Sequence, residues 1–339
     1  LNDDGTINEN GKPYTGMKRF DCRRKVLKDL ERLGLLIEQK DHVYSIAQCS
    51  RSKDIIEPLI KPQWFCDCKN MAAMAVDAVR NGDIKIHPKI QEKRWYEWLE
   101  NIHDWCISRQ LWWGHRVPAY IVLIDGKELE DSKKNWVAGR NKKEALASAL
   151  KKFSDIDPKR ITLRQDEDVL DTWFSSGLFP FSTLGWPDKT PDFDAFFPGS
   201  LLETGLDILF FWVARMVMMS LKLTGKVPFK DVFLHAMVRD KFGHKMSKSS
   251  GNSLDPVDVV NGIQLKQLHE QLTKDNFKLS EKDIKRAIQN QKKQFPKGIP
   301  KCGTDALRFG LMSYTSQGRD ICLDINRIIG YRNFCNKIW

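Results

Sequence analysis

The 339-residue sequence lacks several patterns that would place it in common classes of protein. It contains no Gly-x-Gly-x-x-Gly turn, which leaves little support for a dinucleotide-binding oxidoreductase. Its eight cysteines include no Cys-x-x-Cys pair. Cys66 and Cys68 flank one residue, but no second close pair completes a tetrahedral zinc site. We therefore predict reduced thiols of an intracellular protein, and no protein-bound zinc or other metal.

Long apolar runs are also missing. The most apolar segment, residues 206–219, is short and is interrupted by Asp207 and Arg215, so it does not predict a membrane span. No signal peptide opens the chain, the first residue is not Met, and the last, Trp339, falls inside an amphipathic segment. We expect a piece of a longer polypeptide that has no membrane partner.

Positive charge is in excess. The chain has 55 Lys and Arg against 44 Asp and Glu, a formal net charge of +11. This surplus favours a polyanionic partner such as nucleic acid, with an unpartnered basic surface as the alternative. Because 41% of the residues are hydrophobic and 29% charged, the composition is that of a globular chain with room for two domains.

Hydrophobic periodicity and turn residues predict helices, a buried strand and two insertions. We expect packed helices over residues 18–33, 71–79, 203–223 and 304–312, and a buried strand over 232–234. Trp95 and Trp98 have helical spacing and are predicted to be core residues. The polar segment 125–159 is predicted to be a small surface insertion, and the Lys-rich segment 264–300 a helical surface insertion or a partly ordered arm. Alternating strands and helices favour an α/β sheet, with a ligand at the carboxyl ends of its strands.

A lysine loop stands out at residues 244–253, His-Lys-Met-Ser-Lys-Ser-Ser-Gly-Asn-Ser. Lys245 and Lys248 lie three positions apart among hydroxyl side chains such as Ser247 and Ser249, which resist regular helix. Two ammonium groups on an adaptable backbone suit a triphosphate whose charge moves during a reaction. By composition alone, a solvated basic loop would be the ordinary interpretation.

Four blocks of sequence together resemble a known family. They are residues 104–114, Asp-Trp-Cys-Ile-Ser-Arg-Gln-Leu-Trp-Trp-Gly; 166–176, Asp-Glu-Asp-Val-Leu-Asp-Thr-Trp-Phe-Ser-Ser; 203–212, Glu-Thr-Gly-Leu-Asp-Ile-Leu-Phe-Phe-Trp; and the lysine loop. Their order and content resemble the class I aminoacyl-tRNA synthetases of the branched-aliphatic group, and within it the valyl forms. The Lys-rich segment 264–300 looks like the eukaryotic cytosolic branch.

The resemblance implies a reaction and its partners. ATP would activate valine to valyl-adenylate and pyrophosphate, and the valine would pass to the 3′ end of tRNA(Val). Mg²⁺ would accompany the nucleotide, held mainly by phosphates and water. A cytoplasmic location is implied, with a mitochondrial form as the alternative. No oligomer is predicted, and a complex with translation factors is left open.

The same resemblance implies a domain organisation. Residues 1–63 would be the tail of an editing (connective) domain, and 64–250 the C-terminal half of a Rossmann-like catalytic domain with a small insertion at about 120–163. Residues 251–339 would begin a helical stem-contact region that carries the Lys-rich insertion at about 264–300. The His-x-Gly-His signature and the catalytic part of the editing domain are absent. We therefore expect this chain to be inactive alone and unable to deacylate threonyl-tRNA.

The family's nucleotide site maps onto matching positions. Lys245 and Lys248 would be the catalytic cations that contact the phosphates. The implied ATP-binding set is Gly205, Asp207, His235, Lys245, Ser247, Lys248 and Ser249. A charge stabilising a helix N-terminus remains an alternative for Asp207, and a satisfied core histidine an alternative for His235.

Two further groups of residues follow from the resemblance. Trp173 would wall the valine pocket, and Asp171 would hold the substrate ammonium or brace the pocket. Arg109, Trp112 and Trp113 would line the cleft reached by the tRNA end, with aromatic packing around a structural arginine as the alternative. The rival functions are an isoleucyl- or leucyl-tRNA synthetase, or a non-catalytic tRNA-binding fragment.

Overall fold

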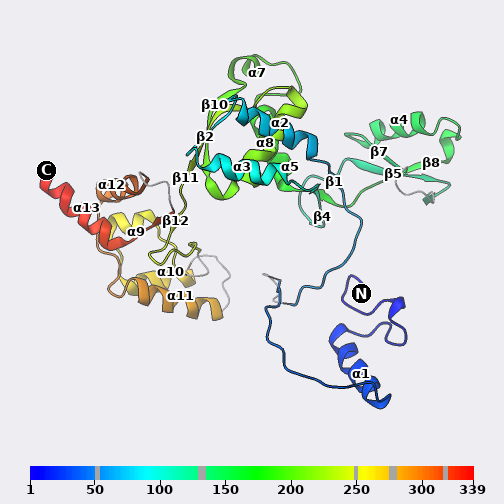
Figure 1. The fold of residues 1–339 in the computed structure, drawn as a ribbon, viewed down its shortest axis with the longest axis horizontal. Coiled ribbons are helices and arrows are strands. Elements are labelled where there is room, and N and C mark those ends of the chain that lie inside the picture. Colours follow the sequence, from blue (N-terminus) through cyan, green and yellow to red (C-terminus); the bar gives the residue numbers. More distant parts are fainter. Residues whose placement is uncertain (50–53, 129–134, 248–250, 275–280, 316–319) are drawn as a thin grey trace. The chain divides into compact units, whose positions relative to one another are not determined.

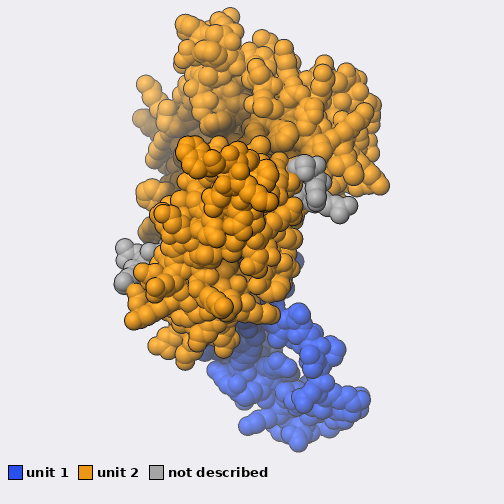
Figure 2. Space-filling model, turned by 90° about the vertical axis from the view of Figure 1, so that its left-hand side faces the viewer, with its two compact units in different colours: residues 1–63 blue, residues 64–339 orange. Residues whose placement is uncertain are grey.

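The chain divides into two compact units, Leu1–Gln63 and Trp64–Trp339, which Figure 2 colours separately. The computed structural model describes every residue except 50–53, 129–134, 248–250, 275–280 and 316–319. Lys248 and Ser249, two of the predicted ATP-binding residues, therefore lie outside the described residues. In the first unit, a short 3₁₀ turn, η1 (Glu9–Gly11), precedes helix α1 (Arg19–Arg32). This confirms the helix predicted over 18–33.

The second unit is built on a three-stranded parallel sheet in the order β10-β11-β2 (Figure 1). Its strands are β2 (Lys85–His87), β10 (Gly199–Gly205) and β11 (Phe229–His235). Helices α2 (Lys69–Arg80), α3 (Gln91–Glu100) and α8 (Ala214–Thr224) pack with the sheet around one apolar core that includes the fully buried Val232. The predicted α/β class, the helix over 71–79 and the strand over 232–234 are confirmed. The strand is buried on one face only, since Phe233 is 48% exposed.

The helix predicted over 203–223 is wrong in its first half. Residues 203–205 end strand β10, because they pair in register with residues 233–235 of β11. A 3₁₀ turn, η4 (Leu206–Ile208), and a π turn, η5 (Leu209–Val213), follow before α8 begins at Ala214. Apolar side chains occur throughout this segment, so the pairing with β11 decided what their periodicity could not.

Trp95 and Trp98 have different environments. Trp95 is fully buried, as predicted, whereas Trp98 is 37% exposed. Its ring stacks on Phe210 with centroids 4.7 Å apart, at the surface of the core. The prediction that Trp98 is a core residue is therefore wrong, because a spacing of three positions leaves the second side chain at the margin of the buried face.

The predicted surface insertion at 125–159 belongs to a small antiparallel sheet with its own core. Strand β5 (Ala119–Ile124) pairs with β6 (Lys127–Glu128), β7 (Trp136–Ala138) and β8 (Ile161–Gln165), and helix α4 (Lys142–Lys152) packs with β7 and β8. Val122, Ala145 and Ala149 are fully buried. Because these few apolar side chains are widely spaced in a polar sequence, the composition of the segment does not predict that it has a core.

Helices dominate the C-terminal part of the second unit. They are α9 (Pro256–Asn261), α10 (Leu265–Lys274), α11 (Glu281–Gln294), α12 (Thr304–Thr315) and α13 (Ile325–Ile338). A separate core contains Leu268, Phe295, Ile299 and Ile328. Helices α10 and α11 within 264–300, and α12 over 304–312, confirm the predicted helices where the structure describes them. Ala287 and Gln291 are buried, so the described part of the Lys-rich segment does not lie wholly on the surface.

Short elements complete the second unit. They are β1 (Phe65–Cys66), β3 (Trp105–Cys106), β4 (Ser108–Arg109), η3 (Pro158–Arg160), β9 (Val169–Leu170), α5 (Thr172–Gly177), α6 (Phe179–Ser182), α7 (Pro191–Phe196), β12 (Val238–Arg239) and β13 (Ile321–Cys322). Within the part of the chain that the structure describes, no helix combines the length and apolarity needed to cross a membrane.

Candidate active site

Three of the predicted nucleotide residues meet where β10 and β11 end side by side. Gly205 and His235 are register partners in the parallel pair, so both lie at the carboxyl edge of the sheet. A Cβ added at Gly205 would lie 2.7 Å from Asp207 Oδ1, 3.0 Å from Met237 Sδ and 3.4 Å from His235 Nε2. A side chain at this position would have to displace the Asp207 carboxylate, so glycine allows this close approach without a shift. The exposed Asp207 carboxylate can accept hydrogen bonds from hydroxyl groups.

Glu203 opens the sequence block 203–212 but was not among the predicted site residues. Its carboxylate forms a short contact with His235 Nδ1 across the β10–β11 pair. An imidazole held at Nδ1 presents Nε2 in a fixed orientation, here toward Gly205. Glu203 and His235 lie 32 positions apart in the chain, and only the strand pairing brings them together.

The lysine loop is anchored by two buried polar side chains. Asp240 Oδ1 accepts hydrogen bonds from the amides of Phe242 (3.0 Å) and His244 (2.9 Å), and Asn252 Oδ1 accepts one from the amide of Ser247 (2.9 Å). Burial raises the pKa of Asp240, but hydrogen bonds from Asn252 and the two amides outweigh it and hold the pKa below its ordinary value. The anchors leave the Lys245 side chain exposed.

Asp171 is the centre of a second cluster. Its carboxylate, 5% exposed, accepts hydrogen bonds from Trp105 Nε1 and Arg109 Nη2, both at 3.0 Å, and caps α5 through the Trp173 amide at 3.3 Å. Arg215 Nη1 lies 3.7 Å from Asp171 Oδ2. A carboxylate with this many internal partners is occupied in bracing the structure, which favours that alternative over a contact with the substrate ammonium.

Arg215 was not among the predicted site residues, although it stands out in the sequence as a charge inside the apolar segment 206–219. Its guanidinium lies 4.1 Å from the ring centroid of Trp105. Burial lowers the pKa of Arg215, and the negative charge of Asp171 opposes that change. A buried cation in an apolar helix indicates a buried anion elsewhere in the chain, and Asp171 is that anion.

Trp173 lies beside the Asp171 cluster. Its indole stacks on Phe211 with ring centroids 5.9 Å apart, and Phe211 belongs to the π turn that follows Asp207. Trp112 and Trp113 are 102% and 89% exposed, so these aromatic rings do not pack in the core. Arg109 differs from them, since its guanidinium also donates to the carbonyls of Cys106 and Ser108.

A cavity of about 450 Å³ adjoins the Asp171 cluster and is lined in part by Trp98, Trp105, Arg109 and Arg215. Within the described ranges, no group of three or more His, Cys, Asp or Glu side chains is placed to hold a metal ion.

These motifs and this geometry agree with a family assignment. The family model for tRNA synthetases class I (I, L, M and V) matches residues 22–324, and the chain belongs to this family. The family that the four sequence blocks predict is thereby confirmed.

Curated relatives narrow the resemblance. The chain is 54% identical to the valine--tRNA ligase of Mus musculus over 96% of this chain and 26% of that protein. It is 55% identical over its whole length to the ligase of Caenorhabditis elegans and to a mitochondrial one of Saccharomyces cerevisiae, covering 32% and 30% of them. The chain thus spans about a quarter to a third of the length of these relatives.

Among solved structures, a methionyl-tRNA synthetase of Mycobacterium tuberculosis in complex with methionyl-adenylate is 18% identical, with a TM-score of 0.44 over 68% of this chain and 36% of that one.

Proposed function

We propose that this chain is part of a valine-tRNA ligase, which activates valine with ATP and transfers it to the 3′ end of tRNA(Val). The observation that carries the proposal is the identity of 54–55% to valine--tRNA ligases over nearly the whole chain. Because the chain spans only part of those proteins, we propose that it acts within a longer polypeptide. Residues 1–63 would then be the tail of the editing domain, 64–250 the C-terminal half of the catalytic domain and 251–339 the start of the stem-contact region.

In the activation step, the valine carboxylate attacks the α-phosphorus of ATP, and pyrophosphate leaves with the electrons of the broken P–O bond. Gly205 would let the nucleotide approach the sheet edge, and Asp207 would accept hydrogen bonds from the ribose hydroxyls. His235, held by Glu203, would contact adenine or phosphate. Mg²⁺ would enter as a counterion of ATP, bound through phosphates and water.

The lysine loop would follow the charge that develops on the leaving pyrophosphate. Lys245 is exposed on a backbone pinned by Asp240 and Asn252, so its ammonium can reach a ligand while its peptide stays fixed. Lys248, Ser247 and Ser249 would complete the phosphate contacts, as the sequence predicts. A preorganised cation stabilises the transition state more than the bound ATP, because more negative charge has developed on the leaving pyrophosphate in the transition state.

The Trp173 indole would limit the volume of the amino-acid pocket, with Asp171 bracing the helix that carries it. A rigid aromatic wall disfavours isoleucine, whereas threonine fits a valine-shaped pocket almost as well, for which valyl enzymes are a well-known example. The exposed Trp112 and Trp113, together with the half-buried Arg109, would receive the tRNA end. For location, we propose the cytoplasm, with a mitochondrial form as the alternative.

Amino-acid-dependent exchange of pyrophosphate into ATP tests the proposal. The full-length protein that carries this chain should exchange with valine far faster than with isoleucine or leucine. Lys245→Ala should slow valine exchange on the order of 10²-fold, the cost of one lost transition-state contact. Lys266→Ala, an exposed lysine on α10, is the matched control. A preference for isoleucine or leucine would contradict the proposal.

A tRNA-binding fragment without catalysis is the second candidate, favoured by the net charge of +11. It predicts salt-dependent binding of tRNA by a protein that forms no adenylate. Adenylate formation by the full-length protein excludes this candidate.

A further inference from the structure

Helix α11, the second helix of the Lys-rich segment, presents one row of buried or half-buried residues. Ala287, Gln291 and Gln294 recur at the spacing of one helical face, and the first two are 0% and 5% exposed. Gln289 and Lys292 are exposed. The lysines of this helix thus face water, while the row containing Gln294 faces the rest of the second unit.

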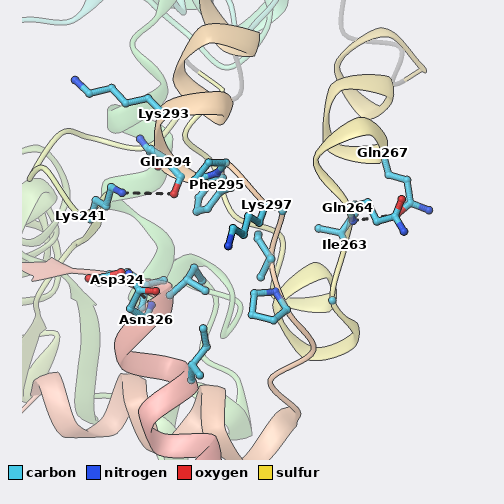
Figure 3. Close-up of a pocket in the computed structure, with 18 residues that line it drawn as sticks. Lys241, Ile263, Gln264, Gln267, Lys293, Gln294, Phe295, Lys297, Asp324 and Asn326 are labelled. Atoms are coloured by element: carbon cyan, nitrogen blue, oxygen red, sulfur yellow. Dashed lines mark hydrogen bonds between the residues drawn. The ribbon is translucent and has the colours of Figure 1, made fainter.

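The row meets the base of the lysine loop. Gly251 has φ +66°, and a Cβ added there would lie 2.6 Å from Ala287 Cα and 2.7 Å from its carbonyl oxygen. The backbone of the loop therefore touches the backbone of α11, and only glycine allows that approach. On the same face, Lys241 Nζ donates to the Gln294 carbonyl at 3.4 Å (Figure 3).

A chain of hydrogen bonds extends this contact to the peptide of Lys245. Gln294 Nε2 and Asn252 Nδ2 both donate to Asp240 Oδ2, at 3.0 and 3.1 Å. Asn252 Nδ2 also lies 3.2 Å from the Lys245 carbonyl, and Asn252 Oδ1 accepts from the Ser247 amide. Asp240 and Asn252 are 2% and 4% exposed, so water does not compete for these bonds.

We propose that α11 supports the lysine loop, and that Gln294 is a positioning residue which holds Lys245 where the phosphates of ATP bind. The inference rests on the proposed function and gives the Lys-rich segment a role in amino-acid activation. The other role such a segment could have, a lysine arm for the tRNA backbone, would use only the outward face of the helix.

The test compares Gln294 variants of the full-length protein in valine-dependent pyrophosphate exchange. Gln294→Met removes the donor to a buried carboxylate and keeps the volume, so kcat should fall roughly tenfold to a hundredfold. KM for valine should stay unchanged, because the proposed contacts of Lys245 are with the phosphates of ATP and not with the amino acid. Gln289→Met, on the exposed face of the same helix, should match the unaltered protein. Circular dichroism and active-site titration confirm that equal amounts of folded protein are compared.

Gln294→Glu supplies a readout that a structural role alone would not move. The introduced carboxylate would face Asp240, whose negative charge raises the pKa of the new group, whereas the cation of Lys241, which donates to the Gln294 carbonyl, opposes that rise. His244 Nδ1 lies 3.5 Å from Asp240 Oδ2 in every variant, so Gln294→Met controls for its contribution. Lowering the pH from 8 to 6 should therefore restore part of the exchange rate of Gln294→Glu relative to the unaltered protein, but not that of Gln294→Met.

Each outcome decides between the two proposals. If the unaltered protein exchanges with valine and Gln294→Met exchanges equally well, the positioning role is refuted and the proposed function stands. If Gln294→Met binds tRNA more weakly but keeps its rate of pyrophosphate exchange, the positioning role is refuted in favour of a lysine arm that binds the tRNA backbone. An unaltered protein without valine exchange would refute the proposed function itself.

Discussion

Removing the Asp171 carboxylate should destabilise the second unit more than most single substitutions. Asp171→Ala leaves the Arg215 guanidinium, whose side chain is 12% exposed, without its anion, and leaves Trp105 Nε1 without its acceptor. Breaking a buried ion pair by deleting one partner costs about 3–5 kcal/mol, because the other charge stays buried. Arg109, 38% exposed, can turn to water and adds little.

Amide hydrogen exchange measures this cost locally in the full-length protein. A loss of about 4 kcal/mol corresponds to exchange on the order of 10³-fold faster in α5 and α8, since each 1.36 kcal/mol is a factor of ten. Asp171→Asn keeps an acceptor for Trp105, so its amide exchange rates in α5 and α8 should lie between those of the unaltered protein and those of Asp171→Ala. Asp192→Ala, an exposed aspartate of α7, is the control. Acceleration of less than about tenfold in α5 and α8 would refute the reasoning.

Three further predictions concern other positions. Gly330→Ala should stabilise α13 by about 0.5–1 kcal/mol in thermal unfolding, since an added Cβ meets nothing within 4 Å; a lowered midpoint would contradict this. Trp173→Ala should reduce the preference for valine over isoleucine in kcat/KM at least tenfold, or roughly 1–3 kcal/mol, and an unchanged ratio would remove Trp173 from the pocket. The pKa of Asp240 is lower in the folded protein than in the unfolded chain, where it is about 4. The ionised carboxylate therefore stabilises the fold fully above about pH 4, and this stabilisation is lost as the pH falls through the pKa of the folded protein. Amide exchange at His244 should accelerate in that acid range but not in Asp240→Asn.

The sequence predicted elements best where local signals agreed. The helix over 18–33 has an apolar face and a glycine at its end, and the structure has α1 at Arg19–Arg32. The segment 203–223 failed, because apolar residues at every face fit a strand, a π turn and a helix equally well. Pairing with β11 resolved the ambiguity, and it is a contact between distant residues.

The candidate site shows the same division. Motifs picked out Gly205, Asp207 and His235, which the structure brings together at one edge of the sheet. The predicted site omitted Glu203 and Arg215. Glu203 contacts His235, and Arg215 lies near Asp171, but neither pair has a characteristic spacing in the sequence that would predict the contact.

The sequence by itself determined the family, the α/β class and the residues suited to bind a nucleotide, because short motifs encode turn geometry and side-chain chemistry locally. Only the tertiary structure decided that Asp171 lies between Arg109 and Arg215 and that α11 touches the lysine loop at Gly251. Such contacts depend on which surfaces are buried against each other, and burial of apolar area is a property of the whole fold.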